Sequence, residues 1–270
     1  MTPTERSANH ARFVALHGDR SPLVLANAWD AASGRLIEEL GAPAVATSSA
    51  AVAWARGHAD GGVLPRSETL DVVRGMVRVL SIPLSIDIED GYSDRPDEVA
   101  ALVRDVAEAG AVGINLEDAG GSPDLLAAKI RAIRVALGDT PLFVNARTDV
   151  YLRGLATGAT AVAATIERLD AYRTAGADGA FVPGLADSEE IASISAAVAL
   201  PLNVMVVPGL PDLARLHSLG VRRLSAGPAL FEIAYARARD AARGFLAGDF
   251  AALSGARLDY AETNRLFEAH

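Results

Sequence analysis

Residues 107–118 read AEAGAVGINLED, and this short stretch contains the unit from which the fold is predicted. The glycine at position 110 is typical of the residue just past a helix end, where a left-handed backbone closes the last turn. The apolar run 113–117 that follows has the length of a buried strand. Polar residues, among them Glu117 and Asp118, gather where that strand ends. Helix, glycine, strand and polar end together form one unit.

The same unit recurs along the chain in both directions. Predicted strands span residues 23–27, 44–48, 84–89, 113–117, 142–147, 179–182, 202–206 and 223–225. Predicted helices span residues 31–40, 67–80, 96–109, 124–137, 159–175, 188–198, 212–219 and 229–246. A helix between two strands forces them to pair in parallel. Eight such units therefore predict an α/β fold, a (β/α)8 TIM-type barrel.

The organisation of the chain supports one barrel rather than several domains. No break in composition divides it, so we expect a single barrel domain over residues 1–270, with 229–270 as a helical C-terminal extension. The rival architecture, a doubly wound open sheet, would carry a GxGxxG turn after the first strand. Residues 26–30 read ANAWD instead, which favours the barrel.

The composition excludes several kinds of chemistry. The chain has no cysteine, which rules out disulfides, cysteine-ligated metals and a thiol nucleophile. Its single lysine, Lys129, falls within a predicted helix, which argues against Schiff-base catalysis. A net charge of −9 argues against nucleic acid or an anionic membrane as a partner. The N-terminus lacks the apolar core of a signal peptide, and the apolar run 42–55 is too short to span a bilayer, so we expect a cytoplasmic protein.

Charged residues collect at the ends of three neighbouring predicted strands. Alternation along a strand places Asp87 and Glu89 on one face, with Glu117 on the next strand and the aligned Asn145 and Arg147 on the one after. Buried carboxylates without partners are costly, so a cation should lie among them. Oxygen ligands without nearby cysteine or histidine favour Mg²⁺, with Mn²⁺ as an alternative. The guanidinium could hold a substrate carboxylate or phosphonate beside the metal.

A purely structural interpretation of some of these residues stays open. Asp118 and Asp149 have the character of helix-capping residues. Arg147 could serve only as a counter-ion to the carboxylates. Ser48 and Ser49, taken alone, could be ordinary turn residues.

Taken together, these segments resemble the isocitrate lyase/phosphoenolpyruvate mutase superfamily. The most specific segment, DIEDGY at residues 87–92, is similar to the family signature D-x-D-T-G-Y/F. The resemblance runs from NAWDA at 27–31 to SAG at 225–227 and includes SSA at 48–50 with Asp60 downstream, ED at 117–118 and NART at 145–148.

The resemblance implies a barrel, usually a tetramer that exchanges its last helix, that breaks C–C or P–C bonds through a metal-bound pyruvate enolate. It implies that Asp87, Glu89 and Glu117 hold Mg²⁺ and its waters. The remaining implied site residues are Ser48 with the amides of Ser49 and Ala50 for the pyruvoyl group, Arg147 for the enolate charge, and Asp60 near the metal waters. Alongside them, Asn145 is a candidate substrate contact, and Asp60 and Tyr92 are candidate proton carriers.

One departure from the family narrows the function. Isocitrate and methylisocitrate lyases carry a K-K-C-G-H loop after the fourth strand, whereas residues 117–123 read EDAGGSP here. We therefore expect a Mg²⁺-dependent lyase or hydrolase that cleaves a C–C bond in a small 2-oxo acid, oxaloacetate-like or a related diacid, and a homo-oligomer, dimer or tetramer. The alternatives are P–C chemistry on a phosphonopyruvate-like substrate and a non-catalytic barrel that binds an oxo acid.

Overall fold

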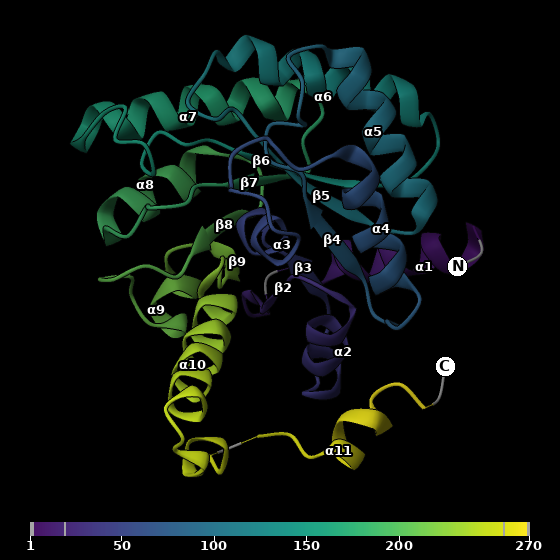
Figure 1. The fold of residues 1–270 in the computed structure, drawn as a ribbon. Helices are drawn as coiled ribbons and strands as arrows, with labels where there is room; N and C mark the ends of the chain where they lie inside the picture. Colours follow the sequence, from purple (N-terminus) through teal and green to yellow (C-terminus); the bar gives the residue numbers. More distant parts are fainter. Residues whose placement is uncertain (1–2, 19, 256, 269–270) are drawn as a thin grey trace.

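The computed structural model describes residues 3–18, 20–255 and 257–268, and it contains a barrel of parallel strands (Figure 1). The strands are β1 Leu23–Leu25, β2 Asn27–Ala28, β3 Val45–Thr47, β4 Leu84–Asp87, β5 Gly113–Glu117, β6 Phe143–Arg147, β7 Gly179–Phe181, β8 Leu202–Met205 and β9 Val221–Ser225. The helices are α1 Pro3–Ala15, α2 Ala31–Glu39, α3 Ser49–Ala55, α4 Arg66–Val77, α5 Pro96–Ala109, α6 Pro123–Leu137, α7 Gly158–Ala175, α8 Ser188–Ala197, α9 Leu213–Ser218, α10 Ala229–Leu246, the 3-10 helix η1 Phe250–Leu253 and α11 Tyr260–Arg265.

The strands pair in the order β1-β9-β8-β7-β6-β5-β4-β3-β2, all of them parallel. β1 pairs with β9 and β2 pairs with β3, and only Ala26 separates the two short strands. They are two halves of one strand, which closes the sheet into an eight-stranded barrel. The predicted (β/α)8 architecture is therefore confirmed.

The glycine stops that motivated the prediction end helices as expected. Gly110 follows α5 with φ 112°, and Gly176 follows α7 with φ 113°. Both lie in the left-handed region, where residues with a Cβ are strained. Each glycine then turns the chain into the next strand, so the local sequence sets the boundaries of the unit.

Two helices lie outside the predicted set. α3 follows β3 directly, with Ser48 as its N-cap, and places an extra helix at the carboxyl end of the barrel (Figure 1). α1 carries Phe13, which is fully buried and packs edge-on against Phe143 of β6, with 5.4 Å between ring centroids. The position of α1 depends on this distant contact, which periodicity along the chain does not reveal.

A buried histidine completes the apolar closure of the amino end. The His17 ring stacks on Phe143 with 4.4 Å between centroids, and its Nδ1 donates to the Phe13 carbonyl at 2.8 Å. Burial, together with the positive charge of Arg223, lowers the pKa of His17 to about 4. The imidazole is therefore neutral at physiological pH.

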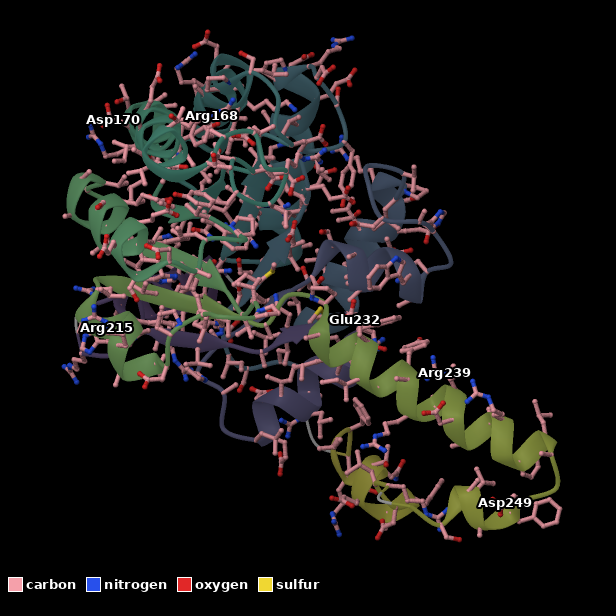
Figure 2. The ribbon with its side chains drawn as sticks, turned by 90° about the vertical axis from the view of Figure 1, so that its left-hand side faces the viewer. Arg168, Asp170, Arg215, Glu232, Arg239 and Asp249 are labelled. Atoms are coloured by element: carbon pink, nitrogen blue, oxygen red, sulfur yellow. The ribbon has the colours of Figure 1, made fainter. Side chains whose placement is uncertain are left out.

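The chain beyond β9 leaves the barrel. α10 projects away from it, with Glu232 near the barrel and Arg239 further out, and Asp249 lies at the far end (Figure 2). α11 returns toward α2, where Arg35 Nε donates to the Leu266 carbonyl at 2.9 Å. None of the helices in the described ranges has the length and apolar character needed to cross a membrane.

Candidate active site

A cavity of about 210 Å³ opens at the carboxyl ends of the strands, the end at which barrel enzymes place their chemistry. The strands and the residues directly after them supply Asn27, Ser48, Asp87, Asn115, Arg147, Phe181, Met205 and Ser225 to its lining. The connecting segments add Ser49, Ala50, Asp60, Leu152, Gly227 and Pro228. The volume equals roughly that of seven water molecules, which suits a short-chain acid.

Asp87 is the most deeply placed carboxylate of the cavity. It ends β4, and its amide donates to Thr47 Oγ1 at 2.8 Å. Its Oδ1 accepts from the Glu89 amide at 3.0 Å, while Asn115 Nδ2 lies 3.5 Å from Oδ2. Burial raises the pKa of Asp87 although Arg147 opposes the shift. Among the described residues no cationic side chain forms an ion pair with this carboxylate.

Glu89 reaches the site by a different route from the one predicted. Strand β4 ends at Asp87, and Glu89 follows with φ 52°, in the left-handed region. The expected alternation that would place both side chains on one strand face is therefore wrong. The Glu89 carboxylate instead accepts a short hydrogen bond from the Gly62 amide. Burial, with added repulsion from Asp60 and Asp87, raises the pKa of Glu89 to about 7.

Glu117 at the end of β5 and Arg147 at the end of β6 form an ion pair. They are register partners across β5 and β6, and Arg147 NH1 lies 2.6 Å from Glu117 Oε2. Asp149 holds the other edge of the guanidinium, at 2.6 Å from Nε and 3.1 Å from NH2. Burial raises the pKa of Glu117 to about 8, helped by Asp87 and opposed by Arg147. The arginine is thus fixed in one orientation by two carboxylates, as the counter-ion interpretation allowed, and it also lines the cavity.

The carboxylates do not converge into a closed cage. Within the described ranges, no group of three or more histidine, aspartate or glutamate side chains lies close enough to enclose a metal ion. Asp87, however, faces the cavity and forms no ion pair among the described residues. Glu89 follows it on the same strand end and Glu117 ends the neighbouring β5; both have raised pKa values, and neither is among the residues that line the cavity. Mg²⁺ usually takes one or two carboxylates directly and keeps several waters. The donor set fits a hydrated ion held directly by Asp87.

The other predicted site residues divide into two groups. Ser48, Ser49, Ala50 and Asp60 line the cavity, as expected for residues that meet a substrate. Ser48 also caps α3, since its side chain accepts from the Ala51 amide at 3.4 Å.

Tyr92 and Asn145 do not line the cavity. Tyr92 has φ 59° and packs against the hydrophobic core. Burial, followed by the negative charge of Glu89, raises its pKa far above the ordinary value, so it is a poor proton carrier. Asn145 is buried beneath the cavity, where Nδ2 donates to Asn115 Oδ1 at 2.9 Å and to Asn203 Oδ1 at 3.1 Å. Asn145 is therefore not placed for the predicted substrate contact, and the asparagines that line the cavity are Asn27 and Asn115.

Sequence reasoning missed the polar layer to which Asn145 belongs. Asn115, Asn145 and Asn203 stand on β5, β6 and β8, and Arg223 of β9 donates to Asn115 Oδ1 at 3.2 Å. Arg223 is fully buried and lies over the Phe13 ring at 5.9 Å, between the plugged amino end and the cavity. A repeated signal was available, because each asparagine sits between two apolar residues in a strand, as in INL, VNA and LNV.

Asp118 has a structural role, although it adjoins Glu117. It accepts hydrogen bonds from the Gly120 amide at 2.9 Å, the Asp149 amide at 3.0 Å, Arg168 at 2.8 Å and the Tyr172 hydroxyl at 2.7 Å. Burial opposes ionisation, but these donors lower the pKa of Asp118. The capping role expected for it from the sequence takes the form of a turn that joins the ends of β5 and β6.

Comparison with known proteins places this barrel among enzymes. Residues 13–246 match the family model described as phosphoenolpyruvate phosphomutase. A solved structure from Burkholderia cenocepacia J2315, provisionally assigned as a phosphonomutase, is 41% identical with a TM-score of 0.80 over 84% of this chain and 96% of that one. A second from the same organism, provisionally assigned as a lyase or mutase, is 35% identical with a TM-score of 0.88 over 98% of both chains. An oxaloacetate decarboxylase of Paraburkholderia xenovorans (strain LB400) is 32% identical over 80% of this chain and 75% of its own length.

A match over most of the chain, with close relatives that share the whole barrel, establishes the family. The chain belongs to the phosphoenolpyruvate phosphomutase family of enzymes, as the resemblance of its strand-end motifs implied.

Proposed function

We propose that the chain is a Mg²⁺-dependent lyase that cleaves a C–C bond in a small 2-oxo carboxylic acid of the oxaloacetate type. The observation that carries the proposal is Asp87, a half-buried carboxylate that faces a small cavity and forms no ion pair with a cationic side chain of the described residues. The 32% identical oxaloacetate decarboxylase supports the choice of substrate class. When bound, the metal would supply Lewis-acid polarisation of the 2-oxo group.

Arg147 would stabilise the charge that develops as the bond breaks. Glu117 and Asp149 hold its guanidinium from two sides, at 2.6 Å each for the closest atoms, so no reorganisation is needed during the reaction. Such preorganised charge acts most strongly where water is excluded. Ser48, Ser49 and Ala50 lie on the same cavity and would orient the carboxylate of the substrate.

The reaction on oxaloacetate balances without a cysteine acid. The C3–C4 bond breaks, C4 leaves as CO₂, and the electron pair moves onto the 2-oxo oxygen. A proton from water then reaches C3 and gives pyruvate. Asp60 lies on the exposed side of the cavity, where it would orient that water.

P–C chemistry is the second candidate function, and the 41% identical relative assigned as a phosphonomutase favours it. The same polar groups would bind a phosphonate in place of the carboxylate. The two candidates release different products, CO₂ from one and inorganic phosphate or a rearranged phosphate ester from the other.

We also propose that a second copy of the chain covers α10. Of its eighteen residues only Phe231 is buried, while Ile233 and Tyr235 are 60% and 51% exposed. Figure 2 shows the helix standing clear of the barrel. An amphipathic helix with unburied apolar residues is typical of an interface. Light scattering should report an oligomer, and Ile233→Asp should shift the mass toward the monomer.

A substrate screen tests the catalytic proposal. The protein is incubated with Mg²⁺ and either oxaloacetate or phosphonopyruvate, pyruvate is measured by a coupled assay, and phosphate is measured separately. Rates without enzyme are subtracted, because metal ions decarboxylate oxaloacetate slowly by themselves. Pyruvate and CO₂ without phosphate support the lyase. Phosphate release, or a phosphate ester detected by phosphorus NMR, would move the assignment to P–C chemistry, and oxalate binding without any of these products would identify a non-catalytic barrel.

A further inference from the structure

The interior of the barrel holds a charged side chain that spans it. Arg223 lies in the middle of β9 and is fully buried. Its NH2 donates to Asn115 Oδ1 of β5 at 3.2 Å. With β1 and β2 counted as one strand, β5 and β9 are four positions apart in the ring of eight, so they face each other across the axis. The arginine therefore reaches across the barrel, where branched apolar side chains are usual.

This guanidinium is incompletely paired. Phe13 lies beneath it, with 5.9 Å from Cζ to the ring centroid, and Nε and NH1 have no hydrogen-bond partner among the described residues. Burial lowers the pKa of Arg223 to about 10, and the charge of Asp87 opposes the shift. A buried cation with two unpaired donors costs folding free energy. Stability alone therefore gives no reason for an arginine at this position.

The side chain that Arg223 contacts is the amide of Asn115. The Oδ1 atom accepts from Arg223 and also from Asn145 Nδ2 at 2.9 Å. An amide oxygen has two lone pairs, so both are used and the oxygen faces the interior. Nδ2 then points the other way and lies 3.5 Å from Asp87 Oδ2. Since Asn115 and Asp87 both line the cavity, the orientation of this amide is set from beneath the cavity.

The two ends of the polar layer require the same orientation of Asn115. At one end, Asn203 Nδ2 donates to the Val204 carbonyl at 2.7 Å, which leaves Asn203 Oδ1 to accept from Asn145 at 3.1 Å. Asn145 therefore presents its NH2 group to Asn115. At the other end is Arg223, which has donors and no acceptor. Without Arg223, Asn115 Oδ1 would keep a single donor, and the torsion of its amide is soft.

We propose that Arg223 is a positioning residue, which holds Asn115 so that an N–H donor faces Asp87. The proposal rests on the proposed function, in which Asp87 binds the metal. Asp87 Oδ1 already accepts from the Glu89 amide at 3.0 Å. A donor on each oxygen fixes the plane of the carboxylate, as the outer-shell partners of metal ligands do. Arg223 does not line the cavity, so it acts through Asn115.

Metal binding tests the proposal without an assay of turnover. The metal-free wild type and its variants are titrated with Mn²⁺, and EPR measures the free ion. Arg223→Met keeps an unbranched side chain without charge or donor, and it should bind Mn²⁺ at least about tenfold more weakly. Its midpoint of urea unfolding should stay the same or rise, because a buried and incompletely paired charge is removed. A fall in this midpoint with unchanged Mn²⁺ affinity would assign Arg223 a purely structural role.

Three further variants separate the cationic donor from the rest of the side chain. Arg223→Lys keeps a cationic donor and should retain most of the wild-type affinity for Mn²⁺. Arg223→Gln is shorter and uncharged, so it should lose affinity as Arg223→Met does, and it takes the place of that variant if the methionine protein does not fold. Arg222→Met is the matched control: Arg222 precedes Arg223 on β9, its NH1 donates to the Val221 carbonyl at 3.1 Å, and it lines a cavity at the amino end of the barrel. It should bind Mn²⁺ as the wild type does.

A second readout follows the Asn115 amide directly. The chain has six asparagines, so ¹⁵N labelling of their side chains gives a simple NMR spectrum, and Asn115→Ser assigns the Asn115 signal. In the metal-free protein, Arg223→Met and Arg223→Gln should shift and broaden this signal. Arg222→Met should leave it unchanged.

The outcomes separate this inference from the proposed function. If the wild type binds no Mn²⁺, the proposed function fails, and the Asn115 signal alone decides the role of Arg223. If the wild type binds Mn²⁺ and both neutral Arg223 variants bind it equally well, the positioning role is overturned while the proposed function stands. The role is also overturned if the Asn115 signal is the same in the wild type and both neutral variants, or if Arg223→Lys loses as much affinity as Arg223→Met.

Discussion

The two ends of the barrel bury titratable groups for opposite reasons. At the carboxyl end, Glu89 and Glu117 have raised pKa values because burial and neighbouring carboxylates disfavour their charge. At the amino end, His17 has a lowered pKa because it is packed against Phe143 and near Arg223. Both ends favour neutral groups, and each borders a cavity: Asp87 and Arg147 line the one at the carboxyl end, and His17 and Phe143 line the one at the amino end. The comparison indicates that the carboxyl end gathers charged side chains around its cavity, whereas the amino end packs aromatic rings that hold the barrel together.

The largest expected effect is a loss of turnover when Glu117, which pairs with Arg147, is replaced. Glu117→Gln should lower kcat/KM about 1,000-fold, because it removes one of the two carboxylates that orient the Arg147 guanidinium and one of the groups that would hold the metal and its waters. The free energy of unfolding should change little, because glutamine keeps the size of the side chain and Asp149 still pairs with the guanidinium. Steady-state kinetics and urea unfolding measure the two effects. Glu108→Gln, on the exposed face of α5, is the control, and full Mg²⁺-dependent turnover by Glu117→Gln would contradict the proposed function.

A substitution at the amino end of the barrel should lower stability and leave turnover unchanged. Phe13→Ala should lower the free energy of unfolding by about 4 kcal/mol, because it empties the space under the Phe143 ring. The folded protein should keep its kcat, since Phe13 does not line the cavity. Val135→Ala, at a side chain that is 83% exposed, should change stability by less than about 0.5 kcal/mol. Equal losses from the two variants would show that α1 does not close the barrel.

The next effect separates the two adjacent acids at the end of β5. Asp118→Asn should cost about 3 kcal/mol of stability, because it leaves Arg168 and Tyr172 without a buried anion. Asp170→Asn is the control: it breaks an ion pair with Arg173 in which both side chains are exposed, and it should cost about 0 to 1 kcal/mol. Arg168 and Asp170 lie close together on α7 in Figure 2. Chemical unfolding distinguishes the two variants, and a loss in both of the same size would contradict a structural role specific to Asp118.

The smallest effect is a dependence of stability on pH at the amino end. The unfolded chain binds a proton at His17 below about pH 6.5, whereas the folded protein binds it only near pH 4. The unfolded state therefore gains protons first, and stability is lost as the pH falls from about 6.5 to 4. The loss is about 1 kcal/mol at pH 5.5 and reaches about 3 kcal/mol near pH 4. Unfolding free energies at several pH values should fall more steeply for the wild type than for His17→Phe, and parallel curves would disprove this role.

The order of strands and helices was predictable because the residues at each boundary determine where that helix or strand ends. Gly110 and Gly176 end helices through their own backbone freedom, and apolar runs between them form the strands. α1 was not predictable in this way, since its place depends on Phe13 meeting Phe143, 130 positions further along the chain.

The site was predictable in its residue types but only partly in its geometry. Asp87, Arg147 and Ser48 line the cavity because strand ends converge in a barrel, a property of the fold. Glu89 departs from the expected alternation because the strand ends two residues earlier and the backbone turns left-handed. Asn145 and Tyr92 were misplaced because depth within the barrel depends on register and loop packing, which single-strand patterns do not contain.

The most direct test of the account is the Mg²⁺ dependence of turnover by the wild type and Asp87→Asn. With oxaloacetate and the rate without enzyme subtracted, the wild type should release pyruvate and CO₂ only when Mg²⁺ is present, and EDTA should abolish the activity. Asp87→Asn should be at least about 1,000-fold slower while it remains folded by circular dichroism. Turnover that persists in EDTA, or a folded Asp87→Asn variant as active as the wild type, would contradict a metal-dependent site centred on Asp87.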